Sequence, residues 1–300
     1  MSFVNGLTIA ICTMHREDDL LKCIKSIFRQ SVFFDNYSSE LIVVDDGALT
    51  KEYLDKIERF SSGKCPFIYK KKAKKGLIHS RVEAIRAATY EVVLFLDDDV
   101  ELEDGYLDCL LQTYSSDQEV VAVGGVNVLQ KEGFLGRLIK QIAGLTSRNP
   151  GRLSFSGFGG SMSLWALQEE TFTSEFLSGC NMSFRLGTIR NIAVPDWLEG
   201  YSLGEDLYFS RHASRHGKVL VNPLLRVKHY ESPFSRQPSS HTAYSRITNH
   251  YNLLRMDHRR SVSKFKIALS GLFLLASSVG KPQILKGYLK GLLWAAVSGS

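Results

Sequence analysis

Short apolar runs alternate with amphipathic segments along the first half of the chain. The apolar runs have the length of β-strands and cover residues 7–12, 41–44, 66–69, 92–96 and 120–123. The segments between them repeat apolar residues at helical spacing and cover residues 17–30, 51–60, 78–88 and 103–114. Continuous apolar runs are typical of strands that helices cover on both faces. The pattern therefore predicts an α/β fold with a parallel, doubly wound sheet.

The regular alternation stops between residues 127 and 176. Within this stretch, residues 152–163 place three glycines among serines and phenylalanines, which predicts a mobile loop or lid. Farther along, residues 203–216 have helical spacing, and residues 219–221 and 225–227 resemble short strands.

The C-terminal part of the chain contains two apolar runs, residues 267–279 and 284–297, separated by Gly280, Lys281 and Pro282. Each run is shorter than the ~20 apolar residues that span a bilayer. Residues 259–300 contain no acid but several lysines. Two interpretations stay open: a pair of helices packed on the rest of the chain, or a basic amphipathic hairpin lying in a membrane interface. We predict one unit at residues 1–230 and a basic, apolar helical segment at residues 231–300.

Charge and cysteine content limit which binding partners and which cellular compartment are expected. The 300 residues carry a net charge of +6, from 37 basic and 31 acidic residues, and 70–75 form a basic run broken only by Ala73. Basic patches can bind nucleic acid, anionic lipid or phosphorylated ligands. No known nucleic-acid-binding motif accompanies the basic patches of this chain, so we expect no nucleic-acid partner. Five scattered cysteines without CxxC spacing, and an N-terminus without signal-peptide features, predict a cytoplasmic protein.

Acidic residues follow two of the predicted strands. Asp45 and Asp46 end one strand, and Asp97, Asp98 and Asp99 follow the run at 92–96. Ligands of parallel sheets bind at the carboxyl ends of the strands. Adjacent carboxylates repel one another unless a cation joins them, and hard oxygen ligands suit Mg²⁺ or Mn²⁺ with substrate phosphates. The alternative is a solvated acidic turn that caps the next helix.

Four further residues are candidates for chemistry. Arg81 begins a predicted helix where it could meet a diphosphate, or it is simply exposed. Glu205 and Asp206 follow Gly204; either they cap a helix, or Asp206 is a general base. His229 ends a predicted strand and either completes a metal shell or has a structural role. The absence of Walker, GxGxxG and GxSxG motifs removes the usual support for kinase, dehydrogenase and hydrolase functions.

These segments also combine into a recognisable series. The blocks ICTMHRE, ELIVVDDGA, GLIHSRVEAI, VVLFLDDDV, FLSGCNMSFR and GEDLYFSRHASRHG resemble family 2 glycosyltransferases and cover about residues 7–230 in family order. The resemblance implies a GT-A, Rossmann-like fold with a mostly parallel central sheet flanked by helices, here with a helical C-terminal extension. It also implies inverting transfer of a sugar from a UDP- or GDP-linked donor to an acceptor hydroxyl, with Mn²⁺ or Mg²⁺. The acceptor would be a saccharide or a lipid-linked molecule in polysaccharide, glycolipid or other cell-surface glycan synthesis.

The resemblance further implies roles for individual residues. Those expected to contact the nucleotide-sugar are Thr13, Asp46, Arg81, Asp97, Asp98 and Glu205. Asp99 and His229 would bind the metal, and Asp206 would be the catalytic base. Residues 179–185 match the block that closes over the donor sugar on the acceptor side. Ala48 stands where serine is usual, which affects base recognition more than the fold.

Two other functions are alternatives to a glycosyltransferase. A sugar-nucleotide-forming nucleotidyltransferase would carry a glycine-rich loop with Arg or Lys near its first strand, and this chain lacks one. A catalytically inactive, membrane-associated nucleotide-binding protein would be favoured by loss of Asp99 or Asp206, and both are present. We therefore expect a cytoplasmic transferase, with peripheral association at the inner face of the cell membrane as an open alternative.

Overall fold

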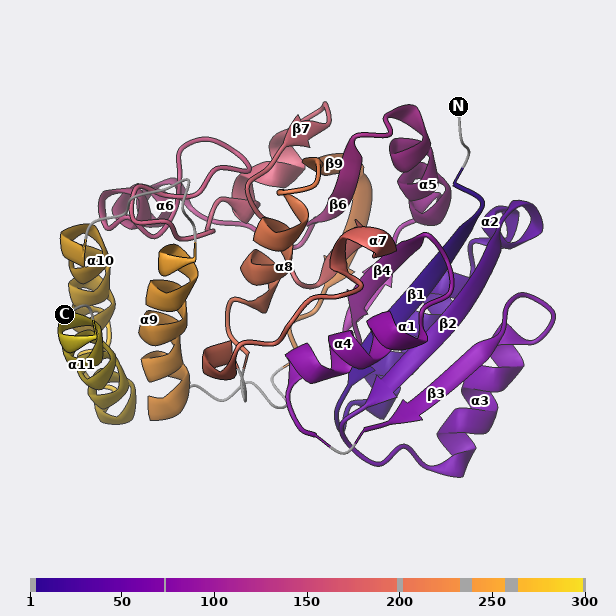
Figure 1. Cartoon of the computed structure of the whole chain (residues 1–300), viewed down its shortest axis with the longest axis horizontal. Helices are drawn as coiled ribbons and strands as arrows, with labels where there is room; N and C mark the ends of the chain where they lie inside the picture. Colours follow the sequence, from indigo (N-terminus) through magenta and orange to yellow (C-terminus); the bar gives the residue numbers. More distant parts are fainter. Residues whose placement is uncertain (1–3, 73, 199–201, 233–238, 257–263, 299–300) are drawn as a thin grey trace.

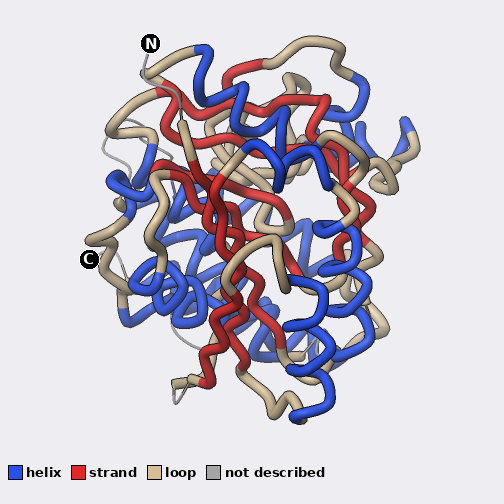
Figure 2. The backbone as a smooth tube through the Cα atoms, turned by 90° about the vertical axis from the view of Figure 1, so that its right-hand side faces the viewer, coloured by secondary structure: helices blue, strands red, loops and turns tan. Residues whose placement is uncertain are grey.

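A computed structural model describes residues 4–72, 74–198, 202–232, 239–256 and 264–298. Ala73 of the basic run, and residues 233–238, 257–263 and 299–300 of the predicted C-terminal segment, lie outside the described residues. One nine-stranded sheet forms the centre, with strand order β3-β2-β1-β4-β8-β6-β9-β5 and β7 paired to β9 (Figure 1). Helices flank this sheet on both sides, which confirms the predicted α/β class (Figure 2).

The N-terminal half of the sheet is parallel. Its strands are β1 (Gly6–Thr13), β2 (Ser38–Asp45), β3 (Phe67–Lys71) and β4 (Val92–Asp97). The helices that connect them are α1 (Glu17–Phe28), α2 (Ser31–Asn36), α3 (Lys51–Ser61) and α4 (Leu77–Ala87). The register places Cys12 beside Asp97 and Thr13 beside Asp45, so the carboxyl ends of β1, β2 and β4 lie level.

The other half of the sheet is mixed. Its strands are β5 (Val100–Leu102), β6 (Val120–Asn127), β7 (Phe172–Thr173), β8 (Asn181–Arg185) and β9 (Lys218–His229). β8 is antiparallel to both β4 and β6, whereas β6 and β9 are parallel. The two short strands predicted near the end of this half are one long strand, β9. Its last residue, His229, pairs with Val100, directly after the three acids.

Two apolar layers cover the faces of the sheet, and alternate strand residues feed them. Ile9 and Ile11 of β1 join one buried cluster with α1, α3 and α5 (Tyr106–Ser116), while Ala10 joins the other cluster with α4 and α8 (Glu205–Ala213). This period of two explains why the strands read as continuous apolar runs.

The remaining elements come after β6 in the chain. They are α6 (Phe134–Ile142), η1 (Met162–Leu167), α7 (Leu186–Ile189), η2 (Asp196–Leu198), α9 (Ser240–Arg255), α10 (Lys264–Ala276) and α11 (Pro282–Val297). Helices α9, α10 and α11 share a third apolar cluster. The division at residue 230 stays a prediction. In the described part of the chain, no helix has both the length and the apolar character needed to cross a bilayer.

The predicted lid at residues 152–163 is anchored to these helices. The Ser156 hydroxyl donates to the Gly144 carbonyl at 2.6 Å, and the Ser156 carbonyl lies 2.9 Å from His250 Nε2. Phe158 stacks on the His250 ring with centroids 3.5 Å apart. The Ser156 carbonyl thus holds the loop to α9 and the Ser156 hydroxyl bonds to Ser270 of α10, while the mobility of the loop stays a prediction.

Candidate active site

The three consecutive acids form the turn between β4 and β5. Asp97 is partly exposed, while the carboxylates of Asp98 and Asp99 are almost fully buried. The turn sends Asp97 and Asp99 towards the end of β9 and sends Asp98 towards β1. The alternative of a solvated acidic turn is therefore wrong.

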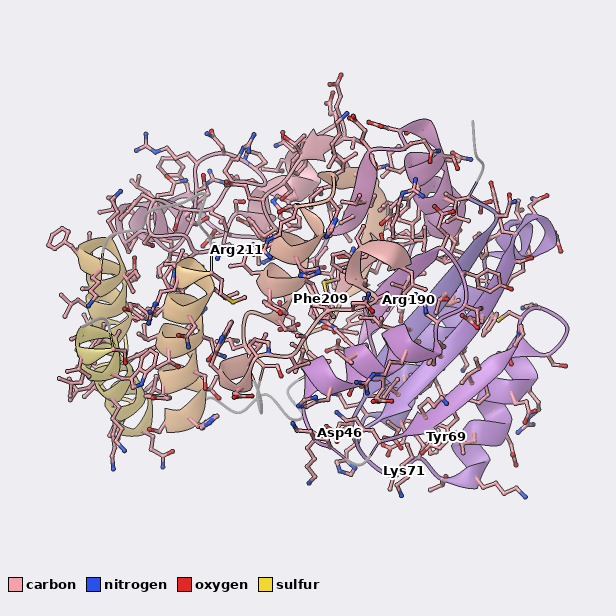
Figure 3. The ribbon with its side chains drawn as sticks, viewed as in Figure 1. Asp46, Tyr69, Lys71, Arg190, Phe209 and Arg211 are labelled. Carbon is pink, nitrogen blue, oxygen red and sulfur yellow. The ribbon has the colours of Figure 1, made fainter. Side chains whose placement is uncertain are left out.

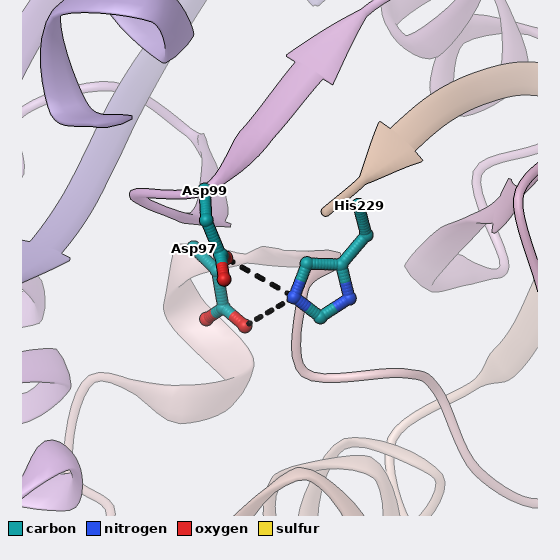
Figure 4. A group of neighbouring side chains, drawn as sticks. All are labelled: Asp97, Asp99 and His229. Carbon is teal, nitrogen blue, oxygen red and sulfur yellow. Dashed lines mark ion pairs between the residues drawn. The ribbon is translucent and has the colours of Figure 1, made fainter. Parts of the chain in front are cut away.

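Asp97, Asp99 and His229 converge on one point (Figure 4). His229 Nε2 lies 3.1 Å from Asp99 Oδ1 and 3.7 Å from Asp97 Oδ2, and one ligand atom from each residue lies within 4.8 Å of the others. Burial acts to lower the pKa of His229, but the hydrogen bonds with Asp99 and Cys180 outweigh it and raise the pKa to about 10. Two carboxylates and an imidazole form a suitable donor set for a divalent metal ion.

Asp98 is held by β1 and the turn that follows it. Thr13 Oγ1 donates to Asp98 Oδ2 at 2.7 Å, and Arg16 Nη1 lies 3.0 Å from Asp98 Oδ1 and 3.1 Å from Asp99 Oδ2. Burial raises the pKa of Asp98 to about 7, although Arg16 and Thr13 act to lower it. Arg16 was not among the predicted site residues. The only signal for it was its position in the block ICTMHRE.

Arg81 is 1% exposed and connects three parts of the site. It forms an ion pair with Glu205, donates to the Gly179 carbonyl at 2.8 Å and lies 3.5 Å from Asp97 Oδ1. The alternative of an exposed helix residue is therefore wrong. Burial raises the pKa of Glu205 to about 7, with Arg81 acting to lower it.

Asp206 occupies the first turn of α8, after Gly204, whose φ of 92° suits glycine. Its Oδ1 accepts the backbone N–H of Leu207 at 2.7 Å, so it does interact with the helix N-terminus. Burial raises the pKa of Asp206, and hydrogen bonds from Leu207 and Gly179 partly offset this effect. Among the described residues its carboxylate makes no ion pair, unlike that of Glu205.

Asp45 and Asp46, at the end of β2, differ in environment; Figure 3 labels Asp46, near Tyr69 and Lys71 of β3. Asp45 is buried and accepts from Gly47 N at 2.6 Å, Leu49 N at 2.8 Å and the Tyr69 hydroxyl at 2.9 Å. Asp46 is more exposed and accepts from Gly76 N at 3.0 Å, with Lys72 Nζ 3.2 Å away. Asp45 thus shapes the turn, while the Asp46 side chain is 12% exposed and lies beside the buried side chain of Lys72.

The structure brings all the predicted site residues to one edge of the sheet. Asp46 N donates to the Thr13 carbonyl at 2.9 Å, which joins the end of β2 to the Asp98 side of the acidic turn. Arg81 joins the Asp97 side to the start of α8. Lys72 and Arg16 complete the set, and sequence reasoning did not single them out.

Comparisons with known sequences find one family model and several glycosyltransferases. A model of the family described as Glycosyl transferase family 2 matches residues 8–182. Glucosyl-dolichyl phosphate glucuronosyltransferase of Haloferax volcanii is 26% identical over 125 residues, 41% of this chain and 38% of that protein. Probable N-acetylgalactosaminyltransferase 8 of Caenorhabditis elegans is 24% identical over 255 residues, 77% of this chain and 53% of that protein. The chain thus spans about half or less of these relatives.

Two solved structures are similar in fold. The mannosyltransferase PcManGT from Pyrobaculum calidifontis, in complex with GDP-Man and Mn²⁺, has a TM-score of 0.54 and 17% identity, covering 98% of this chain and 76% of its own. GalNAc-T7 with UDP, GalNAc and Mn²⁺ has a TM-score of 0.61 and 16% identity, covering 99% of this chain and 56% of its own.

Proposed function

Because the chain belongs to glycosyl transferase family 2 and has the GT-A fold, we propose that it is an inverting, metal-dependent transferase. It moves a sugar from a nucleotide diphosphate sugar to an acceptor hydroxyl. The observation that carries the proposal is the convergence of Asp97, Asp99 and His229 at the edge where the first turn of α8 carries Asp206. The buried side chain of Arg81 contacts Asp97 of this cation site and Glu205, the neighbour of the proposed base.

The nucleotide is assigned to the ends of β1 and β2. The partly exposed carboxylate of Asp46 can accept a hydrogen bond from an N–H of uracil or guanine, which supports a UDP- or GDP-linked donor. Thr13 and Asp98 would lie beside the ribose, and the charge of Lys72 near Asp46 suits an anionic ligand. The two similar solved structures hold GDP-Man in one case and UDP in the other.

Asp97, Asp99 and His229 would hold the metal ion. When bound, the ion supplies positive charge that stabilises the leaving diphosphate. Mg²⁺ prefers oxygen ligands in a strict geometry, so a set that includes the imidazole nitrogen favours Mn²⁺ over Mg²⁺. The buried Asp99 is oriented by hydrogen bonds from Ser232 N at 2.8 Å and Arg16 at 3.1 Å.

Asp206 acts on the acceptor. Its carboxylate takes the proton of the acceptor hydroxyl as that oxygen bonds to the anomeric carbon, and the bond to the diphosphate breaks with its electron pair leaving on the phosphate oxygen. Attack from the opposite face inverts the anomeric centre. The raised pKa of Asp206 strengthens it as a base. Glu205, neutralised by Arg81, orients this segment and lines the sugar site.

The acceptor is a saccharide or a lipid-linked molecule. The name of the Haloferax volcanii relative refers to a lipid-phosphate-linked sugar, which supports a glycolipid or polysaccharide intermediate. Residues 1–230 form the catalytic unit in this proposal, and we propose a cytoplasmic location, which five free cysteines support.

A donor screen tests the proposed function. The protein is incubated with UDP- and GDP-sugars and Mn²⁺ or Mg²⁺, with lipid and saccharide acceptors supplied, and released nucleoside diphosphate is measured. Release that requires metal and is lost in Asp99→Ala and Asp206→Asn is expected. The exposed Asp104, in the turn before α5, provides the control Asp104→Asn, which should retain release.

Two outcomes would contradict the proposal. Donor binding without turnover would favour an inactive nucleotide-binding protein. Failure to bind any sugar nucleotide would mean that the acids at the end of β4 do not form a donor site.

A further inference from the structure

Helix α6 is amphipathic, but its apolar side faces outward. Phe134, Leu135 and Ile142 are 72%, 67% and 68% exposed, and none of the helix's residues is buried. At 100° per residue, its five apolar side chains fall within an arc of about 140°. A helix on the surface of a soluble protein normally turns such an arc towards the core. The exposed arc of α6 therefore indicates that another molecule covers it.

Hydrogen bonds fix α6 against the C-terminal helices. Ser270 Oγ of α10 bonds to the Ala143 carbonyl, which directly follows α6, at 2.7 Å, and to Ser156 Oγ at 2.9 Å. A Cβ atom on Gly144 would lie only 2.7 Å from Ser270 Oγ, so the close approach needs glycine. Figure 1 shows α6 beside the upper end of α10. The two helices therefore form one end of the molecule.

Helix α10 also exposes apolar residues at this end. Phe265 and Leu272 are 77% and 56% exposed, and Leu269 lies between them on the same helical stripe. We call the exposed apolar residues of both helices the apolar end: Phe134, Leu135, Ile139, Ile142, Phe265, Leu269 and Leu272. Several large, exposed apolar side chains on two neighbouring helices are typical of an interaction site.

Charge around the apolar end identifies the partner. The described residues of α10 and α11 include no Asp or Glu, while Lys264, Lys266, Lys281, Lys286 and Lys290 flank their apolar stripes. On α6, Arg137 and Lys140 lie opposite the apolar arc, and the nearby Glu132 is paired with Lys140 at 2.6 Å. Apolar side chains bordered by several lysines, on helices whose described residues include no acid, complement an anionic lipid surface, with its apolar interior and negative headgroups.

We propose that the apolar end docks the protein on an anionic membrane, with α6 lying in the interface plane. Phe134, Leu135 and Ile142 enter the acyl boundary, and the lysines of α10 and α11 meet the headgroups. The proposal goes beyond the transferase activity and does not depend on it. The predicted amphipathic surface lay in the C-terminal helices alone, whereas the structure makes α6 its principal element.

Vesicle sedimentation tests this docking. The full chain is mixed at low salt with phosphatidylcholine vesicles that contain or lack phosphatidylglycerol. The double variant Leu135→Glu/Ile142→Glu changes exposed side chains only, so folding should be retained. The matched control is Val32→Glu/Leu224→Glu, in which residues 62% and 67% exposed on α2 and β9 are changed.

The wild type and the control should bind the anionic vesicles, more weakly at high salt. The α6 variant should bind at least about tenfold more weakly, because two apolar side chains no longer leave water. Sugar-nucleotide binding by the same variant separates loss of docking from loss of the proposed donor site.

Three results would overturn the proposal. The first is a wild type that does not bind anionic vesicles at low salt. The second is an α6 variant that binds them as well as the wild type does. Alternatively, the protein would dimerise through α6 in solution and lose the dimer in the variant, which would identify a second copy of the chain as the partner.

Discussion

Arg81 is the residue on which the site's internal geometry depends. Replacing it with methionine keeps an unbranched apolar stem but removes the guanidinium, and leaves Glu205 buried without its ion-pair partner. Breaking a buried ion pair from one side costs about 3–5 kcal/mol. We expect Arg81→Met to lower the free energy of unfolding by about this amount, as measured by urea denaturation.

Arg86 offers a matched control on the same helix. It forms an ion pair with Glu83 at 2.6 Å, three residues away, but its side chain is largely exposed. Exposed pairs of this kind contribute about 0–1 kcal/mol. Equal losses for Arg81→Met and Arg86→Met would contradict the structural role assigned to Arg81.

His250 should make stability depend on pH. It is buried in α9 and stacked on Phe158, and burial lowers its pKa from 6.5 to about 3. Below pH 6.5 the unfolded chain therefore binds a proton that the folded protein excludes. Stability should fall as pH falls, by about 1.4 kcal/mol per pH unit from this group.

The measurement is the free energy of unfolding between pH 6.5 and pH 5. His250→Gln should flatten its pH dependence by about 1.4 kcal/mol per pH unit, whatever its effect on absolute stability. His241→Gln, on the exposed face of the same helix, serves as the control. An unchanged slope in His250→Gln would show that His250 is not held neutral by the fold.

At the residue scale, the acidic residues of the site were easier to predict from the sequence than its basic residues. Asp46 and Asp97–Asp99 stand at the ends of apolar runs, and topology alone places such ends together. Arg16 and Lys72 reach the site from loops, by long side chains whose direction no periodicity encodes. The position of Arg81 at the start of a helix made it a candidate, but only the family resemblance favoured a site role over exposure.

At the scale of elements, the parallel half of the sheet was predictable and the mixed half was not. β1 to β4 follow the regular alternation of strand and helix. β8 lies between β4 and β6 although residues 128–180 separate it from β6, and its pairing is antiparallel. A five-residue strand that depends on such distant partners carries little local signal. Helix α6 was not predicted, because it lies where the alternation of strands and helices stops. No neighbouring strand gives its apolar arc a core to cover, and in the structure that arc faces solvent.

Glycines on α11 set how closely α9 and α11 pack. A Cβ on Gly287 would overlap the Ser240 carbonyl oxygen and approach Ala243 Cβ to 2.8 Å. Overpacking of this kind typically costs 1–3 kcal/mol. We expect Gly287→Ala to lower the melting temperature by separating the two helices, as followed by circular dichroism.

Gly136 on α6 is the comparison, because an added Cβ there meets nothing within 4 Å. Alanine at this helical position should be neutral or stabilise by about 0.5–1 kcal/mol. If Gly287→Ala melted at the wild-type temperature, the close packing of α9 on α11 would be refuted.

At the scale of the whole molecule, the fold assembles the site from distant parts of the chain. Asp97 and Asp99 lie at the end of β4, whereas His229 comes after the mixed half of the sheet has been completed. Only the folded chain brings these three side chains within 4.8 Å of one another. A ligand held by all three must therefore favour the folded state over the unfolded one.

Mn²⁺ should accordingly stabilise the protein. At 100 times its dissociation constant, an ion that binds only the folded chain raises the free energy of unfolding by about 2.7 kcal/mol. We expect this shift in thermal or urea unfolding with Mn²⁺ compared with EDTA, and a smaller shift with Mg²⁺ because His229 contributes nitrogen. Asp99→Ala should abolish the shift, while Asp55→Ala, at an exposed position of α3, should retain it. Equal stabilisation of both variants would place the ion elsewhere, and a larger shift with Mg²⁺ would exclude His229 from the ligands.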